Sequence, residues 1–175
     1  YLYPEKDMNI SVKIENAKLI HTYPKYENGW NVFVTKDGKI TNLKTNLEHY
    51  CLYWEGESNK NYSIDEGYVV KGDDSIKFLE EKLEIMGLNR KEINEFIIYW
   101  LPQLEQNELN LIKFINEEYN ADYPLNIFPK PDSIIRVYMI FKKIDAVDVL
   151  LKEQILKPVQ RKGFSVVEWG GSEIK

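Results

Sequence analysis

The spacing of apolar residues predicts two helices in the middle of the chain. In residues 73–88 the apolar side chains recur at steps of three and four, which places them on one stripe of a helix. Residues 89–106 repeat this pattern, and Asn89 and Glu92 have the spacing of a capping box. Gly87 predicts a left-handed stop between the helices. The stripes consist of Ile76, Phe78, Leu79, Leu83 and Met86, and of Ile93, Phe96, Ile97, Trp100, Leu101 and Leu104.

Pro102 falls inside the second stripe. Proline lacks the N–H that a helix needs, and its ring clashes with the preceding turn. We therefore expect the helix to kink, or to end its regular part near Trp100. Each stripe residue contributes roughly 1.5 to 3 kcal/mol when it is fully buried, so the helical pair needs a large apolar partner. We expect this partner to be a sheet built from strands on both sides of the pair.

Alternating apolar and polar residues predict those strands. Residues 10–14 alternate in this way, which is typical of a strand with one buried and one exposed face. Asp37 and Gly38 favour a tight hairpin turn before a return strand that begins at Ile40. Further strands are predicted at residues 18–23, 30–34, 49–55, 68–71, 111–115, 134–141 and 164–169, the last of which ends before Gly170 and Gly171.

Two later segments are harder to assign from their pattern. Pro124, Pro129 and Pro131 exclude an interior strand, so we expect the segment that contains them to run extended along the surface. Residues 147–155 have weak helical spacing but are soon followed by Pro158, and the pattern leaves helix and strand open.

Together these elements predict one α+β domain over residues 1–175, in which an antiparallel sheet or sandwich packs against a central helical hairpin. Antiparallel strands occupy residues 1–71, the hairpin occupies residues 72–106, and strands with extended segments occupy residues 107–175. With 175 residues, the chain is long enough to bury one sizeable core.

Composition narrows the classes of partner. The formal net charge of -5 comes from acids and bases interspersed along the chain, without a basic stripe that could follow a phosphate backbone, so we expect no nucleic-acid partner. No apolar run approaches the roughly 18 residues of a membrane helix, so we expect no transmembrane segment.

A single cysteine, Cys51, excludes an internal disulfide and leaves the redox compartment open. The chain begins at Tyr1 rather than at methionine, which suggests that an upstream segment with any targeting signal was removed.

Several short motifs, taken in order along the chain, resemble an uncharacterised domain of secreted or lipid-anchored proteins from Gram-positive bacteria. The motifs are YLYP at 1–4, TYP and ENGW within 22–30, YWEG at 53–56, EFIIYWLP at 95–102, KPD and SIIRV within 130–137, and GFSVVEWGG at 163–171. The resemblance implies a location outside the cytoplasmic membrane, either extracellular or anchored to the cell envelope. It implies no activity and no catalytic residues.

Two acids next to tryptophans suggest one kind of chemistry. Glu55 follows Trp54, and Glu168 precedes Trp169, in each case with glycine close behind. A glycosidase needs two carboxylates across a cleft, one as acid and one as base or nucleophile, with aromatic rings to hold sugars. One hypothesis is therefore a carbohydrate-active hydrolase that uses Glu55 and Glu168. The alternative is that the tryptophans are core residues and the acids cap turns.

Other combinations of reactive residues are incomplete. His49 and Cys51 would share one face of the predicted strand, but two residues are too few for a zinc site, so we expect no metal. Asn59, Asn61, Ser63 and Asp65 alternate as oxygen ligands do in a calcium loop. The loop lacks the glycine and glutamate of an EF-hand, which is therefore excluded, whereas a looser surface calcium site stays open. No phosphate-binding loop and no serine-hydrolase elbow is present, so we expect no cofactor.

Arg136 stands on an otherwise apolar strand. If it is buried, it requires a carboxylate partner, for which Glu168 and Glu55 are the candidates, and if it faces outward it needs none.

Aromatic residues gather in the first third of the chain. Tyr26 and Trp30 lie there among asparagines, a composition that suits recognition of sugar rings or of a protein partner, although burial in the core is the alternative. The wider group is Tyr23, Tyr26, Trp30, Tyr53 and Tyr62, and the predicted binding residues are Trp54, Trp169, Arg136, Tyr26 and Trp30. We favour a non-catalytic binding or structural module of the bacterial cell surface, bound to cell-wall glycan or to a surface protein, over an enzyme.

Overall fold

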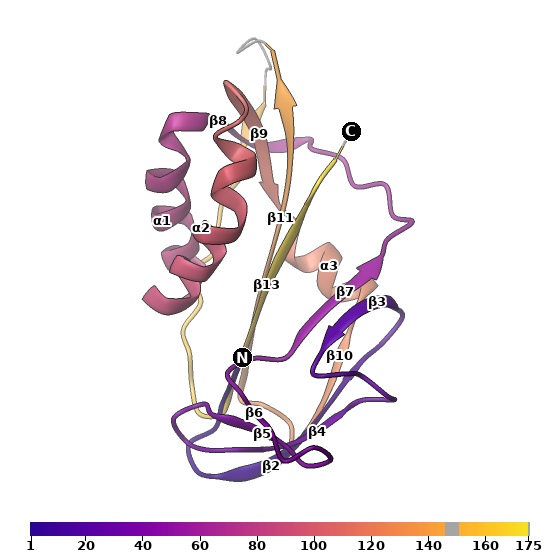
Figure 1. Cartoon of the computed structure of the whole chain (residues 1–175). Helices are drawn as coiled ribbons and strands as arrows, with labels where there is room; N and C mark the ends of the chain where they lie inside the picture. The colour runs from indigo at the N-terminus through magenta and orange to yellow at the C-terminus, as the bar shows by residue number, and fades with distance from the viewer. Residues whose placement is uncertain (146–150, 175) are drawn as a thin grey trace. The chain divides into compact units, whose positions relative to one another are not determined.

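The computed structural model describes residues 1–145 and 151–174. This part of the chain has a mixed α+β fold with three sheets, whose strands pair mostly antiparallel, and three α-helices (Figure 1). The predicted fold class is confirmed. The chain divides into two compact units, so the expectation of one domain over residues 1–175 stays a prediction. Unit 1 comprises Tyr1–Lys60, Glu117–Ile134 and Arg161–Glu168, and unit 2 comprises Asn61–Asn116, Ile135–Gln160 and Trp169–Lys175.

Unit 1 is built on a five-stranded antiparallel sheet with the order β10-β2-β4-β5-β6. These strands are β2 (Met8–Ile14), β4 (Trp30–Val34), β5 (Ile40–Asn42), β6 (Glu48–His49) and β10 (Leu125–Phe128). A separate antiparallel pair joins β3 (Lys18–Tyr23) to β7 (Tyr53–Glu57). In addition, β1 (Leu2–Tyr3) pairs with the first part of β13 (Ser165–Glu173), and α3 (Asn116–Asp122) lies almost entirely in this unit.

The core of unit 1 follows from the alternation seen in the sequence. In β4 the residues Trp30, Val32 and Val34 are buried, while the residues between them are more exposed, because successive side chains of a strand point to opposite faces. Gly38 has a positive φ of 84° in the turn that leads to β5, as the predicted hairpin requires. The buried core residues are Leu2, Ile10, Val12, Trp30, Val32, Val34, Ile40, Ile127, Phe164 and Val166.

Unit 2 packs two helices on one face of a sheet (Figure 1). The strand order is β13-β11-β9-β8-β12, with β12 parallel to β8. Its strands are β8 (Glu66–Lys71), β9 (Leu109–Phe114), most of β11 (Ser133–Ile144), β12 (Lys152–Glu153) and the second part of β13. A 3-10 turn, η1 (Gly72–Asp74), leads into α1 (Ser75–Ile85), which contacts α2 (Arg90–Leu104).

The helical pair forms as predicted. The side chain of Asn89 accepts from the backbone N–H of Glu92, while Glu92 accepts from the backbone N–H of Asn89, so both halves of the capping box are present. Gly87 has a φ of 89° and ends the first helix. Phe96 is fully buried and Trp100 nearly so, which confirms that the apolar stripe of α2 faces the core.

The helical prediction differs from the structure in three details. An end of the regular helix near Trp100 is wrong, because α2 continues through Pro102 to Leu104, which is buried and anchors the last turn in the core; the alternative, a kink at Pro102, stays a prediction. Ile76 is 43% exposed, because it lies at the start of α1, one turn before the first fully buried leucine. The short helix α3 was not predicted; Glu117 and Glu118 in its first turn, near the positive end of the helix dipole, were the available signal.

The predicted strand over residues 49–55 is also wrong. His49 ends β6 in the five-stranded sheet, Tyr53 begins β7 in the two-stranded sheet, and the three residues between them connect the two sheets. The alternation of apolar and polar residues within one short segment does not indicate that the chain leaves one sheet for another.

Later strands differ from the prediction at their ends. β13 runs through both glycines to Glu173. The segment that contains Pro124 and Pro129 forms β10 at the edge of its sheet. The exclusion of an interior strand is therefore confirmed, but the segment pairs with β2 rather than running unpaired along the surface. Of the undecided stretch at residues 147–155, residues 147–150 lie outside the described part, and Lys152–Glu153 form a strand. No helix in the described ranges has the length and apolar character needed to cross a bilayer.

Candidate functional site

A carboxylate in unit 1 gathers residues from three elements. The indole N–H of Trp54 in β7 donates to Oε1 of Glu168 in β13 over 3.0 Å. The hydroxyl of Tyr119 in α3 donates to the same oxygen, also over 3.0 Å. Hydrogen bonds to an ionised acceptor are stronger than neutral ones and contribute roughly 1.5 to 3 kcal/mol each. Glu168 therefore links β7 and α3 to β13.

The rings of this site also pack on one another. Trp54 stacks on Tyr119, with ring centroids 6.4 Å apart and an interplanar angle of 15°. Tyr123 meets the edge of Trp54 at 6.2 Å and contacts Tyr119 at 5.5 Å. Because Tyr119 and Tyr123 are four residues apart on α3, they share one face of the helix. We call Trp54, Tyr119, Tyr123 and Glu168 the Glu168 cluster.

Burial limits what the Glu168 cluster can do. Tyr119 and Tyr123 are buried, whereas Trp54 and Glu168 are partly buried. The hydroxyl of Tyr123 donates to Oγ of Ser58 over 3.0 Å, which fixes the chain just beyond β7. The other three residues of the Glu168 cluster therefore hold the carboxylate of Glu168 in one orientation, with the tyrosine rings packed inside the unit.

An ion pair next to the Glu168 cluster links the segment after β7 to the end of α3. Nζ of Lys60 lies 2.6 Å from Oδ1 of Asp122 at the end of α3. The hydrogen bond that Lys60 donates to Asp122, followed by the attraction of the carboxylate charge, raises the pKa of Lys60. Because both groups are partly solvated, this pair contributes little to stability.

Glu55, the second predicted catalytic acid, occupies a different face. It lies in β7 next to Trp54 and is paired in register with His21 of β3. Since successive side chains of a strand point to opposite faces, Glu55 projects away from the face on which Trp54 meets Glu168. The use of Glu55 and Glu168 as a catalytic pair stays a prediction.

Two predicted binding residues belong to unit 2. Trp169 is partly buried and packs against Phe96 and Tyr99 of α2, with ring centroids 5.4 and 6.3 Å away. Arg136 in β11 is only 5% exposed, which excludes the outward-facing alternative. Both side chains lie where they support packing within that unit.

Two others lie at the core of unit 1. Trp30 is buried, and its indole N–H donates to the carbonyl of Pro24 over 2.8 Å. The hydroxyl of Tyr26 accepts from the backbone N–H of Ile14, and its ring meets the edge of Trp30 at 4.9 Å. These positions favour the core alternative for both residues.

The structure exposes a different set of aromatic residues in unit 1. Tyr23 of β3 is 65% exposed and Tyr53 of β7 is 41% exposed, and the two are directly opposite each other in the β3–β7 register. The ring of Tyr23 meets the edge of His49 at 5.1 Å. Tyr50, which follows His49, is 59% exposed and contacts Tyr1 at 6.5 Å. We call Tyr23, Tyr50 and Tyr53 the tyrosine surface.

Part of the tyrosine surface could be predicted from the sequence. Tyr23 and Tyr53 stood in the predicted aromatic group, but Tyr50 did not. Two tyrosines in neighbouring strands were the available signal, although only the pairing register shows that they are adjacent. Tyr62 of that group belongs to unit 2.

The structure brings together no metal-ligand set from the predicted candidates. His49 ends β6 while Cys51 lies in the connection to β7, so the two do not share a strand. Asp65, at the end of the candidate calcium loop, lies 2.7 Å from the buried ammonium of Lys113. Among residues 1–145 and 151–174, no group of three or more histidine, cysteine or acidic side chains is arranged to hold a metal ion.

Comparison with known proteins gives a partial match. Over 61 residues the chain is 39% identical to a protein of Butyrivibrio fibrisolvens described as an uncharacterised protein in the bglA 3' region. The matched stretch is 33% of this chain and 62% of that protein, so this chain spans less than two thirds of its relative. No described protein family matches the chain, and no solved structure matches it. What this establishes is similarity to part of an uncharacterised bacterial protein.

Proposed function

We propose that this chain is a non-catalytic binding module of the bacterial cell exterior that holds envelope glycan on its tyrosine surface. The location outside the cytoplasmic membrane rests on the motifs shared with secreted and lipid-anchored proteins of Gram-positive bacteria. The partial match to a bacterial protein is consistent with the bacterial part of this proposal.

The observation that carries the proposal is the exposure of Tyr23 and Tyr53 on neighbouring strands. A tyrosine ring offers a flat apolar face to the C–H face of a sugar, and its hydroxyl offers a hydrogen bond at the edge. Exposing large aromatic rings to water gives up the free energy of burial, so three such rings in one unit need a reason.

The spacing of the two rings favours an extended glycan. Adjacent strands lie about 4.8 Å apart, which is close to the advance per sugar along an extended β-linked chain. Tyr23 and Tyr53 can therefore each pack against one of two consecutive sugars. Tyr50 follows His49, whose ring contacts Tyr23, and adds a third exposed ring.

Binding of the folded protein to glycan tests the proposal. The probes are purified peptidoglycan and insoluble β-linked glucan for pull-down, together with their soluble oligosaccharides for calorimetry. The Tyr23→Ala/Tyr53→Ala variant should bind at least about fivefold more weakly, since two ring contacts of roughly 0.5 to 1.5 kcal/mol each are lost. Phe128→Ala is the matched control, because Phe128 is an exposed aromatic residue of unit 1 in another sheet.

Two outcomes would contradict the proposal. One is that the wild-type protein retains none of the glycans. The other is that the double variant binds as tightly as Phe128→Ala. If the glycan is instead cleaved, and Glu168→Gln abolishes the cleavage, the hydrolase hypothesis replaces the binding module.

A further inference from the structure

A groove runs along the edge of the sheet in unit 2. It has a volume of about 640 Å³ and lies between β8 and α1. Five consecutive residues of β8, Gly67 to Lys71, form one wall, and Leu151 and Glu153 close one end. The other wall is a single face of α1, because its residues follow the three- and four-residue steps of a helix. These residues are Lys77, Phe78, Glu81 and Lys82, and Asp74 of η1, the residue before α1, extends the wall.

The backbone of β8 offers hydrogen bonds to this groove. The N–H of Gly72 donates to the carbonyl of Glu108, which continues the antiparallel pairing of β8 with β9. Because hydrogen-bonding direction alternates along a strand, Tyr68 and Val70 also point toward β9, whereas Val69 and Lys71 point away from it. The outward edge at Val69 and Lys71 therefore faces the groove.

The short strand β12 already uses the first part of this edge. Lys152 and Glu153 pair in parallel with Glu66 and Gly67. The chain then leaves the edge, because the carbonyl of Gln154 accepts from the hydroxyl of Tyr68 and its side-chain amide bonds both backbone groups of Phe114. In the described ranges no strand pairs with β8 beyond Gly67 on this side.

The groove has a floor that suits an apolar side chain. The rings of Tyr68 and Phe78 meet at 5.1 Å, and the ammonium of Lys82 lies 5.0 Å from the centre of the Tyr68 ring. A side chain that enters between β8 and α1 would pack against these aromatic rings.

Charge differs between the two ends of the groove. Burial raises the pKa of Tyr68, and the nearby carboxylates of Glu153, Glu66 and Glu81 raise it further, so its end of the groove is acidic. Lys82, which is paired with Glu81, and Lys152, which lies opposite Glu66 in the β12–β8 register, offset these acids in part.

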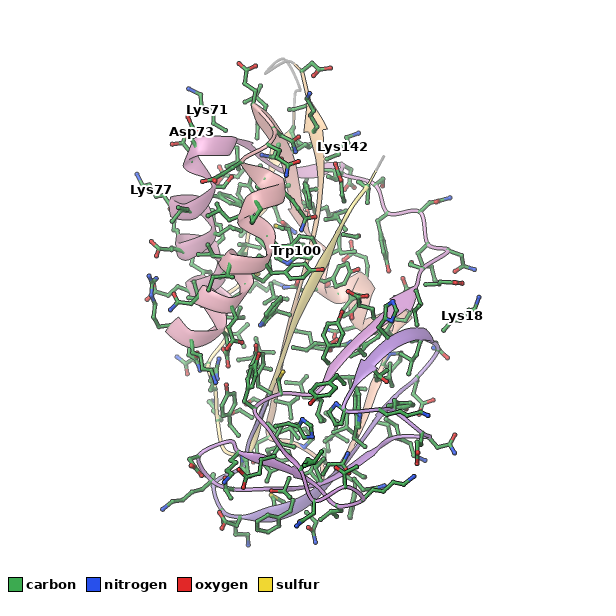
Figure 2. All side chains as sticks on the ribbon, viewed as in Figure 1. Lys18, Lys71, Asp73, Lys77, Trp100 and Lys142 are labelled. Atoms are coloured by element: carbon green, nitrogen blue, oxygen red, sulfur yellow. The ribbon has the colours of Figure 1, made fainter. Side chains whose placement is uncertain are left out.

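The opposite end is basic. It carries the ammonium groups of Lys71 and Lys77, which Asp74 offsets in part, and Figure 2 shows both lysines beside α1. Among the lining residues, the two carboxylates of Glu81 and Glu153 outnumber Lys82 at the Tyr68 end, and Lys71 and Lys77 outnumber Asp74 at the other, so the two sets carry opposite formal charge.

We infer that this groove binds an extended peptide, which adds to the edge of β8 at Val69 and Lys71 as the next stretch of strand after β12. The peptide carries a basic side chain at the Tyr68 end, an acidic side chain at the Lys71 end and apolar residues between them. Backbone hydrogen bonds hold it, and the charges at the two ends select it. This inference is independent of the glycan proposal, because it concerns unit 2 alone.

Four synthetic peptides with the same Val-Ile-Val centre test the inference. They carry Lys and Glu, Glu and Lys, two Lys, or two Glu at their ends, and both termini are blocked. Binding to the whole isotope-labelled chain is followed by NMR. We expect the peptides with mixed ends to bind at least about fivefold more tightly than those with like charges, and to shift the amides of Val69 and Lys71 most.

Two variants test separately the contribution of the backbone edge of β8 and that of the charged side chains. Val69→Pro removes an edge N–H and should weaken the binding of every peptide at least tenfold. Lys71→Glu/Lys77→Glu reverses the basic end and should transfer the preference to the peptide with two lysines, and because both side chains lie at the surface the fold should persist. Lys143→Glu, another surface lysine of unit 2 outside the groove, should leave the preference unchanged.

The inference is overturned if no peptide binds at millimolar concentration. It is also overturned if the shifted amides lie outside β8 and α1, or if the charge reversal leaves the preference as it was. Since none of these measurements involves glycan, a negative result does not bear on the proposal that the tyrosine surface binds glycan.

Discussion

Trp54 and Glu168 are 114 positions apart in the chain, yet the indole of Trp54 donates a hydrogen bond of 3.0 Å to the carboxylate. Tyr119 donates to the same oxygen from a third element. One buried donor and one partly buried donor therefore share one acceptor. A loss of that acceptor should cost more than a loss of either donor, since an unsatisfied buried donor carries the full desolvation penalty.

This relationship predicts a stability order. Glu168→Leu should lower the free energy of unfolding by about 2 to 5 kcal/mol, because Trp54 and Tyr119 both lose their acceptor. Tyr119→Phe should cost about 1 to 2 kcal/mol, since the ring stays and the hydrogen bond to Glu168 goes. Urea denaturation followed by circular dichroism measures both values. Removing the two donors in the Glu168→Leu background with Trp54→Phe and Tyr119→Phe should recover part of the loss, and equal losses in all variants would contradict the arrangement.

The adjacent glycines of β13 should respond differently to alanine. A Cβ at Gly171 would lie 2.5 Å from the carbonyl oxygen of Met139 and 2.9 Å from the ring of Trp100. Gly171→Ala should therefore destabilise the protein by about 2 kcal/mol or more, because a backbone atom must move. A Cβ at Gly170 meets only the ring of Tyr138 at 3.3 Å, so Gly170→Ala should cost less than about 1 kcal/mol. Thermal unfolding of the two variants, compared side by side, decides whether β13 packs this closely.

The capping box at the start of α2 gives a third prediction. Asn89→Ala removes the oxygen that accepts from the backbone N–H of Glu92 and should cost about 1 kcal/mol of unfolding free energy. Asn94→Ala is the control, because Asn94 is exposed on the same helix and alanine favours helix, so its effect should stay within about 0.5 kcal/mol. Chemical denaturation of both variants provides the comparison, and equal effects would mean that the box is unimportant.

The pair of Asp65 and Lys113 should make stability depend on pH in the acid range. The hydrogen bond from Lys113, with help from backbone N–H groups, lowers the pKa of Asp65 in the folded state. A carboxyl whose folded pKa lies below its unfolded value, about 3.9, stabilises the fold above that value. This stability is lost as the pH falls through the folded pKa.

The measurement is the urea midpoint between about pH 5 and pH 2, the range in which a carboxyl of this kind titrates. The midpoint should fall more steeply for the wild-type protein than for Asp65→Asn, which cannot titrate there. Lys113→Met, which keeps a long side chain at a buried position but removes the charge, should flatten the profile in the same way. Parallel profiles for all three proteins would show that the pair of Asp65 and Lys113 does not contribute to the pH dependence of stability.

The helical pair and most strands of unit 1 could be predicted because their signals are local. Asn89 and Glu92 are three residues apart, and Gly87 needs only its own backbone to end a helix. Strand β9 was predicted only in part, since all six of its residues are buried and period-two alternation is lost when both faces are covered. Residues 50–52 were misplaced because leaving one sheet for another is decided by the pairing partners.

The candidate site could be predicted only in fragments. Trp54 and Glu168 were both identified, but as members of two separate acid–tryptophan pairs; nothing in the sequence showed that they bond to each other. Trp30 had the same composition signal as Tyr23, yet one is buried and the other is exposed. A tyrosine or tryptophan suits a core as well as a surface, so its type alone cannot decide its role.

By itself, the sequence determined where the chain becomes helix or strand in most places, since those choices depend on spacing, caps and turns within a few residues. It also determined the α+β class. The tertiary structure decided which carboxylate meets which ring, which tyrosines face water, and how far the described part of the chain pairs along the edge of β8. Each of these depends on segments that are distant in sequence and come together only when the chain folds, so no short pattern contains them.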